Sequence, residues 1–497
     1  MTKLIPLLLL AFLGCSRAPE MEIKTAADLK GRHVAHMSSG FHRRELEAMQ
    51  PGIHFDPYSE YAFAFESLRS RKIDAISIGK IYADLWQAKY PGAYMKAFDY
   101  ADDNIAFLLP KRSPLKAELD GEIRRMKESG EMQSIIAKWL DAAKSDTVPE
   151  LPVQPPPPAG ARTVRVASAA QAEPWCFVAG GKLTGADMEI LGVIATRLGW
   201  RMEPKIYSWG GMVDSINGGR ADLANGSIYI GGLAFPTLDA SEPYAQEKMC
   251  ILVRNPDWKA EAGGVTAFVR SLVESFRRTF LVESRWRMMA KGLGFTLLIT
   301  LLSTLLATLL ALPIWRLRIS KCRFAAETAR KFIAILQGTP ILVLLMVLFY
   351  LVFGAFDVDG FWVAVVGFGL NSSVNVAEML RSGIDSIPAG QTEAALALGY
   401  PPRRAFRRFV LPQAIRIELP VYRGEVISLL KSTSIVGYIA INDLTKASDL
   451  IRSRTYESFF PVLTTAFIYF AAAWLLAWAI DRIGRRLEPG HGRRTGA

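Results

Sequence analysis

Polar side chains inside apolar stretches of the second half of the chain are the residues best suited to handle a solute. Asn371, Ser373 and Asn375 interrupt one such stretch, and Lys431 and Thr433 interrupt a later one. Polar groups within hydrocarbon are costly and often line the route of an ion or solute. They predict a translocation pathway, although hydrogen bonds between neighbouring helices would also account for them.

A basic segment, EAALALGYPPRRAFRRFVLPQ at residues 393–413, lies between two apolar stretches. The residues before Gly399 favour a helix, Gly399 stops it, and Pro401 and Pro402 suit the first turn of a second helix. In that helix the apolar residues share one face and the arginines mostly point elsewhere. The resulting rigid elbow could transmit force from a soluble partner. A basic face resting on lipid headgroups is the simpler alternative.

The patterns that bind nucleotides and metals are missing from the sequence. No GxxxxGK[ST] motif occurs, so another polypeptide must supply any ATP hydrolysis. The four cysteines have no CxxC or Cys/His spacing, so we expect no zinc or redox site. The sequence predicts no catalytic residue, no metal and no cofactor. The net charge of +12 does not indicate nucleic acid, because the basic residues flank apolar spans.

Apolar spans of about 20 residues, the length that crosses a membrane, must position these polar groups. Basic residues follow the first, third and fifth spans, which places those loops in the cytoplasm and everything before Lys291 outside. The spans are predicted near residues 293–314, 333–354, 360–380, 422–442 and 460–481. A basic stretch before Lys291 is interpreted as an amphipathic helix on the outer membrane surface.

The first half of the chain is soluble in character. FDPYSEYAFAFESLRSRKIDAISI and YSWGGMVDSINGGRADLANGSI share one pattern: a strand, a helix, a basic turn, and a strand opening at Asp74 or Asp222. Such repeats predict α/β lobes. VPELPVQPPPPAG, between the two segments, predicts a stiff linker.

The N-terminal MTKLIPLLLLAFLGCS has the pattern of an export signal. It also resembles a bacterial lipoprotein signal, in which Cys15 would be lipidated, although Phe12 stands where that motif usually has Leu. An ordinary signal peptide or an uncleaved anchor is the alternative.

The elbow resembles the loop of ABC importer membrane subunits that docks into the ATP-binding subunit. The matching residues are Glu393, Ala394, Ala395, Gly399, Leu411 and Pro412, with Phe409 at a position that is usually aliphatic. QGTPILVLLMVLFY, AEMLRSGIDSIPAGQTEAALALG and EVISLLKSTSIVGYI extend the resemblance to the polar amino acid permease family across all five spans. The resemblance implies two membrane subunits, expected to be a homodimer, on two ATPase subunits.

The soluble segments resemble the two lobes of periplasmic amino-acid-binding domains, in reversed order. RTVRVAS, GKLTGADMEI and GGRADLANG match the first lobe, whereas DLKGRHVAHMSSG, RKIDAISIG and EMQSIIAKWL, which come earlier, match the second lobe and its return. The resemblance implies a permuted type II periplasmic-binding-protein-like α/β clamshell, followed by an all-α transmembrane domain of about five helices. Two independent domains are the alternative.

The resemblance divides the chain into seven parts. They are a signal (1–20), binding-domain lobe 2 and return (21–145), a Pro-rich linker (146–162), binding-domain lobe 1 (163–256), an amphipathic interfacial helix (257–290), the permease transmembrane domain (291–486) and a cytoplasmic tail (487–497).

By the same resemblance, Trp175 and Trp209 match aromatic residues that clamp a ligand, and Asp187 follows a GxD pattern near the cleft. Ser38 and Ser39 match a hydroxyl and amide nest for a carboxylate. Roles in the lobe core, or in a plain turn for the serines, are the alternatives.

Two charged anchors of the family are missing. Leu233 or Ala234 stands where an Arg is expected, and Gly79 stands where an Asp would bind an ammonium group. An anionic ligand held by the neighbouring Lys80 is one option.

The sequence therefore favours an importer subunit, in the bacterial inner membrane, with a fused extracytoplasmic solute-binding domain for an amino acid or related compound. A degenerate domain that only regulates the permease, or a ligand-sensing membrane receptor, is the alternative. The solute and the ATPase are not specified by the sequence.

Overall fold

The computed structural model describes residues 22–37, 42–58, 60–231, 236–256, 265–354, 356, 358–457 and 459–486. The chain forms two compact units whose boundaries cross the sequence several times. The first unit contains residues up to Ile105, with 229–234 and 245–267, and the second contains the remainder. Cys15, Ser38, Ser39, Leu233 and Ala234 lie outside the described residues.

The first unit is built on a five-stranded mixed sheet with the order β2-β1-β3-β13-β4. β1 is parallel to β2 and β3, whereas β13 is antiparallel to both of its neighbours. The strands are β1 (His33–Met37), β2 (His54–Tyr58), β3 (Ala75–Gly79), β4 (Tyr94–Ile105) and β13 (Ala245–Arg254). The helices are η1 (Ala26–Leu29), α2 (Arg43–Met49), α3 (Tyr61–Arg69) and α4 (Lys80–Lys89). Alternating apolar residues of β1, β3 and β13 form the core with Leu29 and Leu46.

The second unit contains a sheet with the order β10-β6-β11-β5-β12, and a small sheet β7-β8-β9. These strands are β5 (Leu108–Pro110), β6 (Thr163–Ser168), β7 (Gln171–Ala172), β8 (Cys176–Ala179), β9 (Lys182–Thr184), β10 (Arg201–Ile206), β11 (Leu223–Asn225) and β12 (Leu238–Ala240). Its α/β helices are α5 (Leu115–Glu128), α6 (Glu131–Lys144), α7 (Ala186–Leu198) and α8 (Trp209–Asn217).

Each sheet contains a strand from the other segment of the sequence. β13, from the segment after the linker, inserts between β3 and β4, and β5, from the segment before it, lies between β11 and β12. This exchange contradicts the alternative of two independently folded domains. Helix α6 also packs on α7, where the indole of Trp139 donates a 2.6 Å hydrogen bond to Glu189.

The predicted repeat of strand, helix and strand is present in both sheets. In each repeat the aspartate at the start of the last strand accepts a hydrogen bond from the neighbouring strand. The amide of His33 donates to Asp74 at 2.9 Å, and the amide of Arg165 donates to Asp222 at 2.9 Å. The two repeats therefore align their parallel strands by the same contact.

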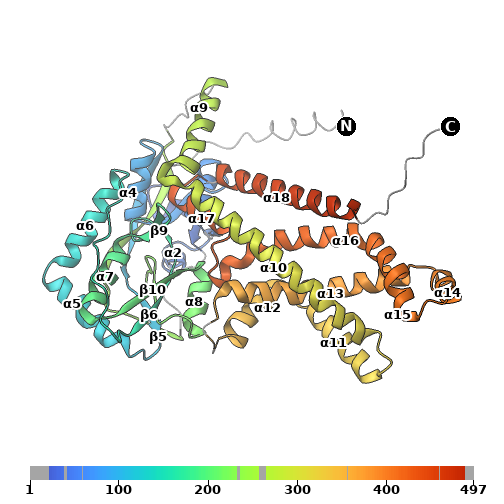
Figure 1. Ribbon diagram of the computed structural model, residues 1–497. Helices are drawn as coiled ribbons and strands as arrows, with labels where there is room; N and C mark the ends of the chain where they lie inside the picture. The colour runs from blue at the N-terminus through green and yellow to red at the C-terminus, as the bar shows by residue number, and fades with distance from the viewer. Residues whose placement is uncertain are drawn as a thin grey trace. The chain divides into compact units, whose positions relative to one another are not determined.

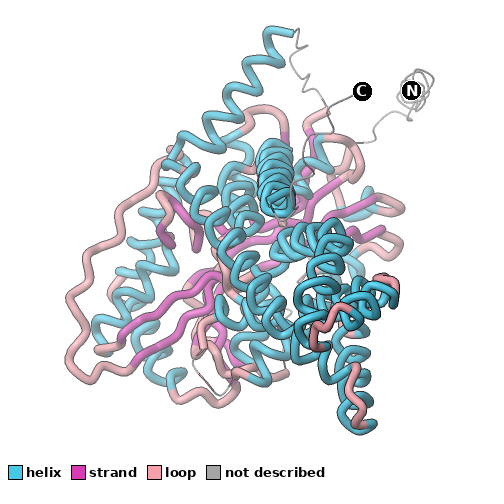
Figure 2. Tube along the Cα trace, turned by 45° about the vertical axis from the view of Figure 1, so that its right-hand side comes forward, coloured by secondary structure: helices cyan, strands magenta, loops and turns pink. Residues whose placement is uncertain are grey.

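Beyond Arg254, every described element is a helix. Figure 2 distinguishes the helices, in cyan, from the strands, in magenta. The first helices beyond Arg254 are α9 (Val265–Phe276), η2 (Arg277–Leu281), η3 (Val282–Ser284), α10 (Trp286–Arg318), α11 (Arg323–Gly338), α12 (Ile341–Met346) and η4 (Val347–Val352). They are followed by α13 (Gly360–Asp385), α14 (Ala389–Ala397), α15 (Pro402–Ala405), η5 (Phe406–Val410), α16 (Leu411–Ser432), η6 (Thr433–Ile439), α17 (Leu444–Thr455) and α18 (Phe459–Arg486).

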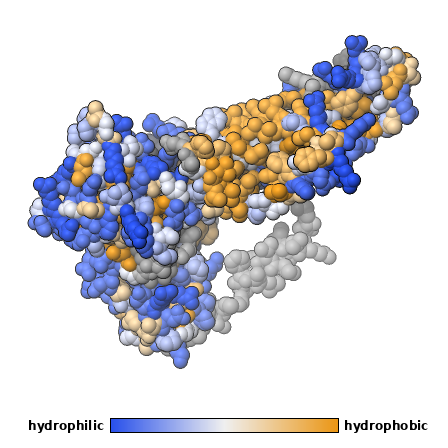
Figure 3. All heavy atoms as spheres, turned by 90° about the horizontal axis from the view of Figure 1, so that it is seen from below, coloured by the Kyte–Doolittle hydropathy of each residue, from blue (hydrophilic) through white to orange (hydrophobic). Residues whose placement is uncertain are grey.

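Three of these helices, α10, α13 and α18, are long and apolar enough to cross a membrane, and two bent pairs raise the number to five. The second predicted span is bent by 106° between α11 and α12, where Gly338-Thr339-Pro340 interrupts the helix. On the face shown in Figure 3, an apolar band covers the helices, with hydrophilic residues at both ends. Leu301, Leu309, Phe467 and Trp474 contribute exposed side chains to the apolar surface. The multi-pass architecture follows from this band.

Candidate functional site

The two predicted aromatic residues of the second unit differ in exposure. Trp175 follows β7, is 1% exposed, and lies with its ring centroid 5.9 Å from that of Tyr244. Its buried indole nitrogen has no hydrogen-bond partner among the described residues. Trp209 begins α8 and is partly exposed, behind the N-cap Ser208, whose hydroxyl accepts from the amide of Gly211. Both roles in ligand binding stay predictions.

Asp187, predicted near the ligand, is completely buried at the start of α7. One carboxylate oxygen accepts from the amides of Gly226 at 2.9 Å and Ser227 at 3.3 Å, and the other accepts from the Tyr244 hydroxyl at 2.7 Å. Burial raises the pKa of Asp187 to about 6, against these three hydrogen bonds that lower it. Because both oxygens are already occupied, Asp187 holds the Gly226 loop and Tyr244 in place.

Lys80 is the first residue of α4 and forms an ion pair with the carboxylate of Asp84. Its ammonium group lies 3.3 Å from Asp84, one helical turn away, and Asp84 also pairs with Lys96. The hydrogen bond and the charge of Asp84 raise the pKa of Lys80. Lys80 is therefore already paired, which leaves less positive charge for an anionic ligand.

The side chain of a neighbouring acid, Glu247, occupies the space that a side chain at position 79 would need. A Cβ atom at Gly79 would lie 2.5 Å from the Glu247 carboxylate and 2.5 Å from the Tyr229 hydroxyl. The Tyr229 hydroxyl donates to Glu247 at 2.7 Å, and the amide of Ile81 donates to it at 2.6 Å. Burial raises the pKa of Glu247 to about 7. Sequence reasoning missed Glu247, because its strand belongs to the other segment of the chain.

A second buried acid of the first unit was also missed. Asp103 lies 2.7 Å from His42 Nε2, and its other oxygen accepts from the amides of Asn104 and Gly231 at 2.6 Å. The His42 side chain is buried, and its Nδ1 has no hydrogen-bond partner among the described residues. Through its two oxygens, Asp103 joins the end of β4 to His42 and to the amide of Gly231.

The predicted pathway residues lie on α13, α16 and η6. One of them, Asn375, forms a chain of polar side chains across the bundle with two neighbouring residues. The Asn375 amide donates to Glu425 of α16 at 3.1 Å and accepts from Gln337 of α11 at 3.5 Å. Glu425 was not predicted, although an ionisable residue within a span is itself a signal of function.

The four other predicted pathway residues fall into two groups: two make hydrogen bonds close by in the sequence, and two are at least partly exposed. Ser373 and Thr433 are buried and donate to carbonyl oxygens three residues earlier in the chain, at 2.6 and 2.7 Å. Asn371 is partly exposed on α13, and Lys431 is exposed near the end of α16. Their part in a pathway stays a prediction.

The elbow has the helix, turn and helix that the sequence predicts. α14 ends at Ala397, Gly399 adopts a left-handed φ of +79°, and Pro402 begins α15. The continuation through η5 into α16 buries Ala405 and Val410. In Figure 1, α14 and α15 lie at the far right end of the helical part, whereas α8 lies at its left end.

The tip of the elbow is exposed and partly apolar. Within the elbow, Ala395 is buried, whereas Glu393, Ala394 and Gly399 are exposed. Leu396 and Leu398 expose 43% and 75% of their surface. Phe409 packs edge-on against Tyr400, and Leu411-Pro412 opens α16. Exposed apolar residues on a rigid support are suited to contact with another protein.

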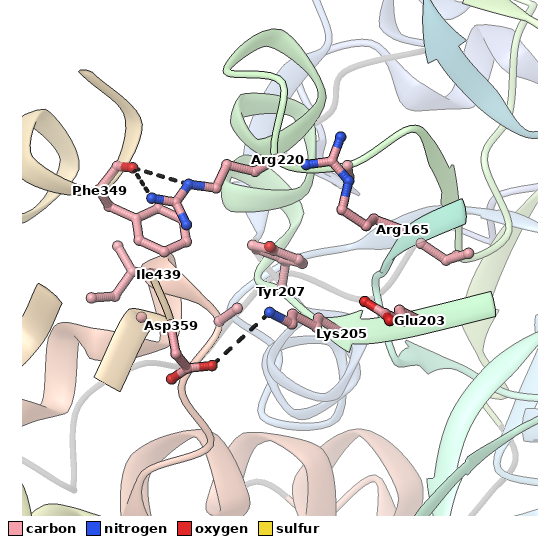
Figure 4. Close-up of a pocket in the computed structure, with 12 residues that line it drawn as sticks. Arg165, Glu203, Lys205, Tyr207, Arg220, Phe349, Asp359 and Ile439 are labelled. Atoms are coloured by element: carbon pink, nitrogen blue, oxygen red, sulfur yellow. Dashed lines mark hydrogen bonds and ion pairs between the residues drawn. The ribbon is translucent and has the colours of Figure 1, made fainter. Parts of the chain in front are cut away.

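A small cavity lies where the α/β part of the second unit meets the membrane helices (Figure 4). Arg165, Lys205 and Tyr207 line it from β6, β10 and the residue after β10, and Phe349 and Asp359 line it from η4 and the N-cap of α13. Its volume of about 30 Å³ accommodates about two water molecules, because one water needs roughly 10–15 Å³ on the same measure. In this conformation it is too small for an amino acid.

Residues 303–489 match the family described as binding-protein-dependent transport system inner membrane component. The chain is 34% identical over 209 residues to the L-cystine transport system permease protein TcyB of Bacillus subtilis, covering 41% of this chain and 89% of the relative. It is 31% identical over 203 residues to the arginine transport system permease protein ArtQ of Bacillus subtilis, covering 40% and 91%.

Solved structures are similar to separate parts of the chain. A crystal structure of an amino acid ABC transporter with histidines covers 40% of this chain and 94% of its own, with 35% identity and a TM-score of 0.37. A mutant of ArgBP from T. maritima covers 46% and 83%, with 14% identity and a TM-score of 0.25.

The relatives match the helical part of this chain along most of their own length, at more than 30% identity. That part contains the predicted pathway residues and the elbow, and the matching proteins are named as permease proteins. The chain belongs to the family of binding-protein-dependent transport system inner membrane components, and is a multi-pass ABC permease subunit fused to an α/β part.

Proposed function

We propose that this chain is the membrane subunit of an ABC importer that takes up an amino acid or a related small polar solute. The elbow carries the proposal, because a rigid, exposed tip of Leu396 and Leu398 lies at the end of the helices opposite α8. The names of the cystine and arginine permeases support the solute class.

In this proposal the elbow contacts the ATP-binding subunit on the cytoplasmic side, and the α/β part faces outward. A second permease subunit, identical or homologous, completes the membrane assembly. ATP-driven closure of the two ATPase subunits would move both elbows and switch the pathway between its inward-facing and outward-facing states. The exposed residues of α9, Val269, Leu272, Val273 and Phe276, recur at helical spacing and suit an outer lipid surface.

We further propose that the α/β part is a permuted solute-binding domain. Trp175, Trp209, Ser38, Ser39 and Lys80 are its candidate contact residues, and Asp187 holds the Gly226 loop and Tyr244 in place from within the core. Glu247 is an additional candidate, because its carboxylate lies where a side chain of Gly79 would be. An ammonium group near Glu247 would favour its charged form and offset the effect of burial.

A regulatory domain that no longer delivers a solute is the second candidate function. The pairing of Lys80 with Asp84 and the absence of a side chain at Gly79 favour it. Melting curves of the full chain in detergent, recorded with single amino acids and with small anions, separate the two. Importer function predicts stabilisation by at least one amino acid, by about 2.7 kcal/mol at 100 times its Kd. No shift with any amino acid would favour regulation.

Co-purification in mild detergent tests the assembly. We expect an ATP-binding subunit to be retained by the parent chain and lost when Leu396→Glu and Leu398→Glu are introduced at the exposed tip. Leu305→Ala and Leu309→Ala, at exposed positions on α10, provide the control. Equal retention of the subunit by both variants would contradict the proposed docking site.

A further inference from the structure

The loop between α8 and β11 is anchored to the membrane helices by Arg220. Its guanidinium donates to the carbonyl oxygen of Phe349 at 2.7 and 3.1 Å, of Phe353 at 2.6 Å and of Val358 at 2.8 Å. It also lies over the Phe349 ring, 4.1 Å from its centroid (Figure 4). Phe349 lies in the last turn of η4, where a helix leaves its acceptors without intrahelical partners. Phe353 is the C-cap residue of η4, and Val358 directly precedes the N-cap of α13. Arg220 therefore caps a membrane helix from the α/β part.

A second contact brings the backbone of α8 against η6. The Tyr350 hydroxyl donates at 3.2 Å to the carbonyl of Gly211 and lies 3.3 Å from that of Tyr438. A Cβ atom at Gly211 would lie 2.7 Å from the Tyr438 carbonyl oxygen, so the approach requires glycine. Lys446 of α17 donates to the carbonyl of Tyr207 at 3.3 Å.

A third contact lies on α17. Leu450 is buried with Ala170, Cys176 and Val178 of the small sheet. Arg454, one turn further along α17, pairs with Glu173 at 2.5 Å and with Glu283 at 3.1 Å. The Arg454 and Glu173 side chains are 3% and 2% exposed. The apolar cluster and the ion pair therefore share one buried surface.

These three contacts have the character of a domain interior. A docking surface that opens in every cycle is usually polar and wet, with charged pairs at its rim. Here the surface combines a buried ion pair, a buried apolar cluster and backbones in close approach. Opening it would expose Leu450 and Cys176 and remove the Arg220 guanidinium from the carbonyl oxygens of Phe349, Phe353 and Val358.

We infer that residues 163–228 stay seated on the outer ends of the membrane helices throughout the transport cycle. Arg220 and Arg454 are positioning residues that make this lobe a fixed part of the permease. Solute capture then requires movement of the first unit only. The proposed solute-binding domain does not dock on and leave the membrane helices as a separate step. The inference relies on the proposed function for the existence of a transport cycle, and on the contacts above for the seating.

The geometry offers a disulfide that would lock the contact. The Cβ atom built at Gly218 lies 3.6 Å from the Cβ of Tyr350, within the range of about 3.5–4.5 Å found in disulfides. Gly218 has a φ of −84°, which other residues adopt readily. Tyr350→Cys also removes the ring that a side chain at position 218 would meet.

The test uses the full chain with Gly218→Cys, Tyr350→Cys and Cys322→Ser, because Cys322 is exposed. A protease site inserted after Pro256 cuts the chain between the two cysteines. On a non-reducing gel, disulfide formation keeps the two fragments together, independently of any transport. Each single cysteine variant provides the control in which the fragments separate.

We expect nearly complete disulfide formation in native membranes, at the same rate with and without ATP. Uptake by the oxidised double variant should stay within twofold of that of the same variant after reduction. Loss of uptake on oxidation with recovery on reduction would overturn the inference, as would a tenfold fall in the rate of disulfide formation during ATP turnover. If the reduced variant shows no uptake, the proposed function fails, while the rate of disulfide formation still tests the seating.

Discussion

The guanidinium of Arg454, on α17, lies 2.5 Å from the carboxylate of Glu173, which precedes β8, and both side chains are almost fully buried. The pair joins the α/β part of the second unit to α17, which forms the second half of a bent candidate span. Removing one partner of a buried pair leaves the other charge without compensation, which costs about 3–5 kcal/mol.

Glu173→Ala should therefore lower the melting temperature of the full chain in detergent. Because Glu283 still pairs with Arg454, we expect a cost near the lower limit, about 3 kcal/mol. Glu242→Ala is the matched control, because Glu242 lies 3.8 Å from Lys127 with both side chains more than a third exposed. Exposed pairs contribute about 0–1 kcal/mol. Equal melting temperatures for the two variants would contradict the role of the buried pair.

Glu247 should make the stability of the first unit depend on pH. Its folded pKa of about 7 is above the ordinary value of 4.5, so the folded state binds the proton more tightly than the unfolded chain. The contribution of Glu247 to the free energy of unfolding is therefore complete below pH 4.5 and decreases as the pH rises to 7. The total decrease is on the order of 3 kcal/mol. Hydrogen exchange of β3 and β13 amides, corrected for intrinsic pH dependence, measures it.

Glu247→Gln keeps the shape and both hydrogen bonds, because the new amide can accept from Ile81 and donate to Tyr229. The variant should therefore lose most of this pH dependence between 4.5 and 7. An unchanged exchange profile in Glu247→Gln would show that another group titrates there.

Gly399→Val should uncouple the elbow. A φ of +79° disfavours every residue with a side chain by about 1–2 kcal/mol, and a β-branched residue most of all. The strain should reorient α15 relative to α14, and we expect ATP-dependent uptake to fall at least tenfold. Gly390→Ala is the control, because Gly390 lies in α14 with open space around it, where Ala favours the helix by about 0.5–1 kcal/mol. Normal uptake by Gly399→Val would argue against a rigid elbow.

Glu425→Gln tests the polar chain across the bundle. The amide oxygen of Gln can still accept from Asn375, so the hydrogen bond is kept and the charge is lost. A hydrogen bond to a charged group is worth about 1.5–3 kcal/mol, so we expect about a tenfold loss of uptake for a solute that meets this charge. Initial rates of uptake measure the effect, and a parent-like rate would remove Glu425 from the pathway.

The local elements of this fold were accessible from the sequence because they depend on local patterns. Gly399 and the following prolines predicted the break in the elbow, and the repeated strand-helix-strand pattern predicted α3 with β3 and α8 with β11. The bend at Pro340 was missed, because a continuous apolar run on both sides of it has the composition of one straight span.

Contacts between distant segments of the chain could not be predicted from the sequence. β13 shows no local sign that it pairs with β3 and β4, because sheet order is decided by the packing of the whole unit. Arg220 and Arg454 look like ordinary surface cations in the sequence, and only the fold brings them to Phe349 and Glu173. Glu247 was missed for the same reason, since its relation to Gly79 depends on the neighbouring strand.

The most direct test of the transport claim is the uptake of labelled amino acids by right-side-out vesicles from the native host. The host lacks its chromosomal copy of the chain and carries the parent or Gly399→Val on a plasmid. We predict ATP-dependent accumulation of at least one amino acid with the parent and at least a tenfold loss with Gly399→Val. Accumulation that is equal in the two strains, or equal without ATP, would contradict an ATP-driven importer coupled through this elbow.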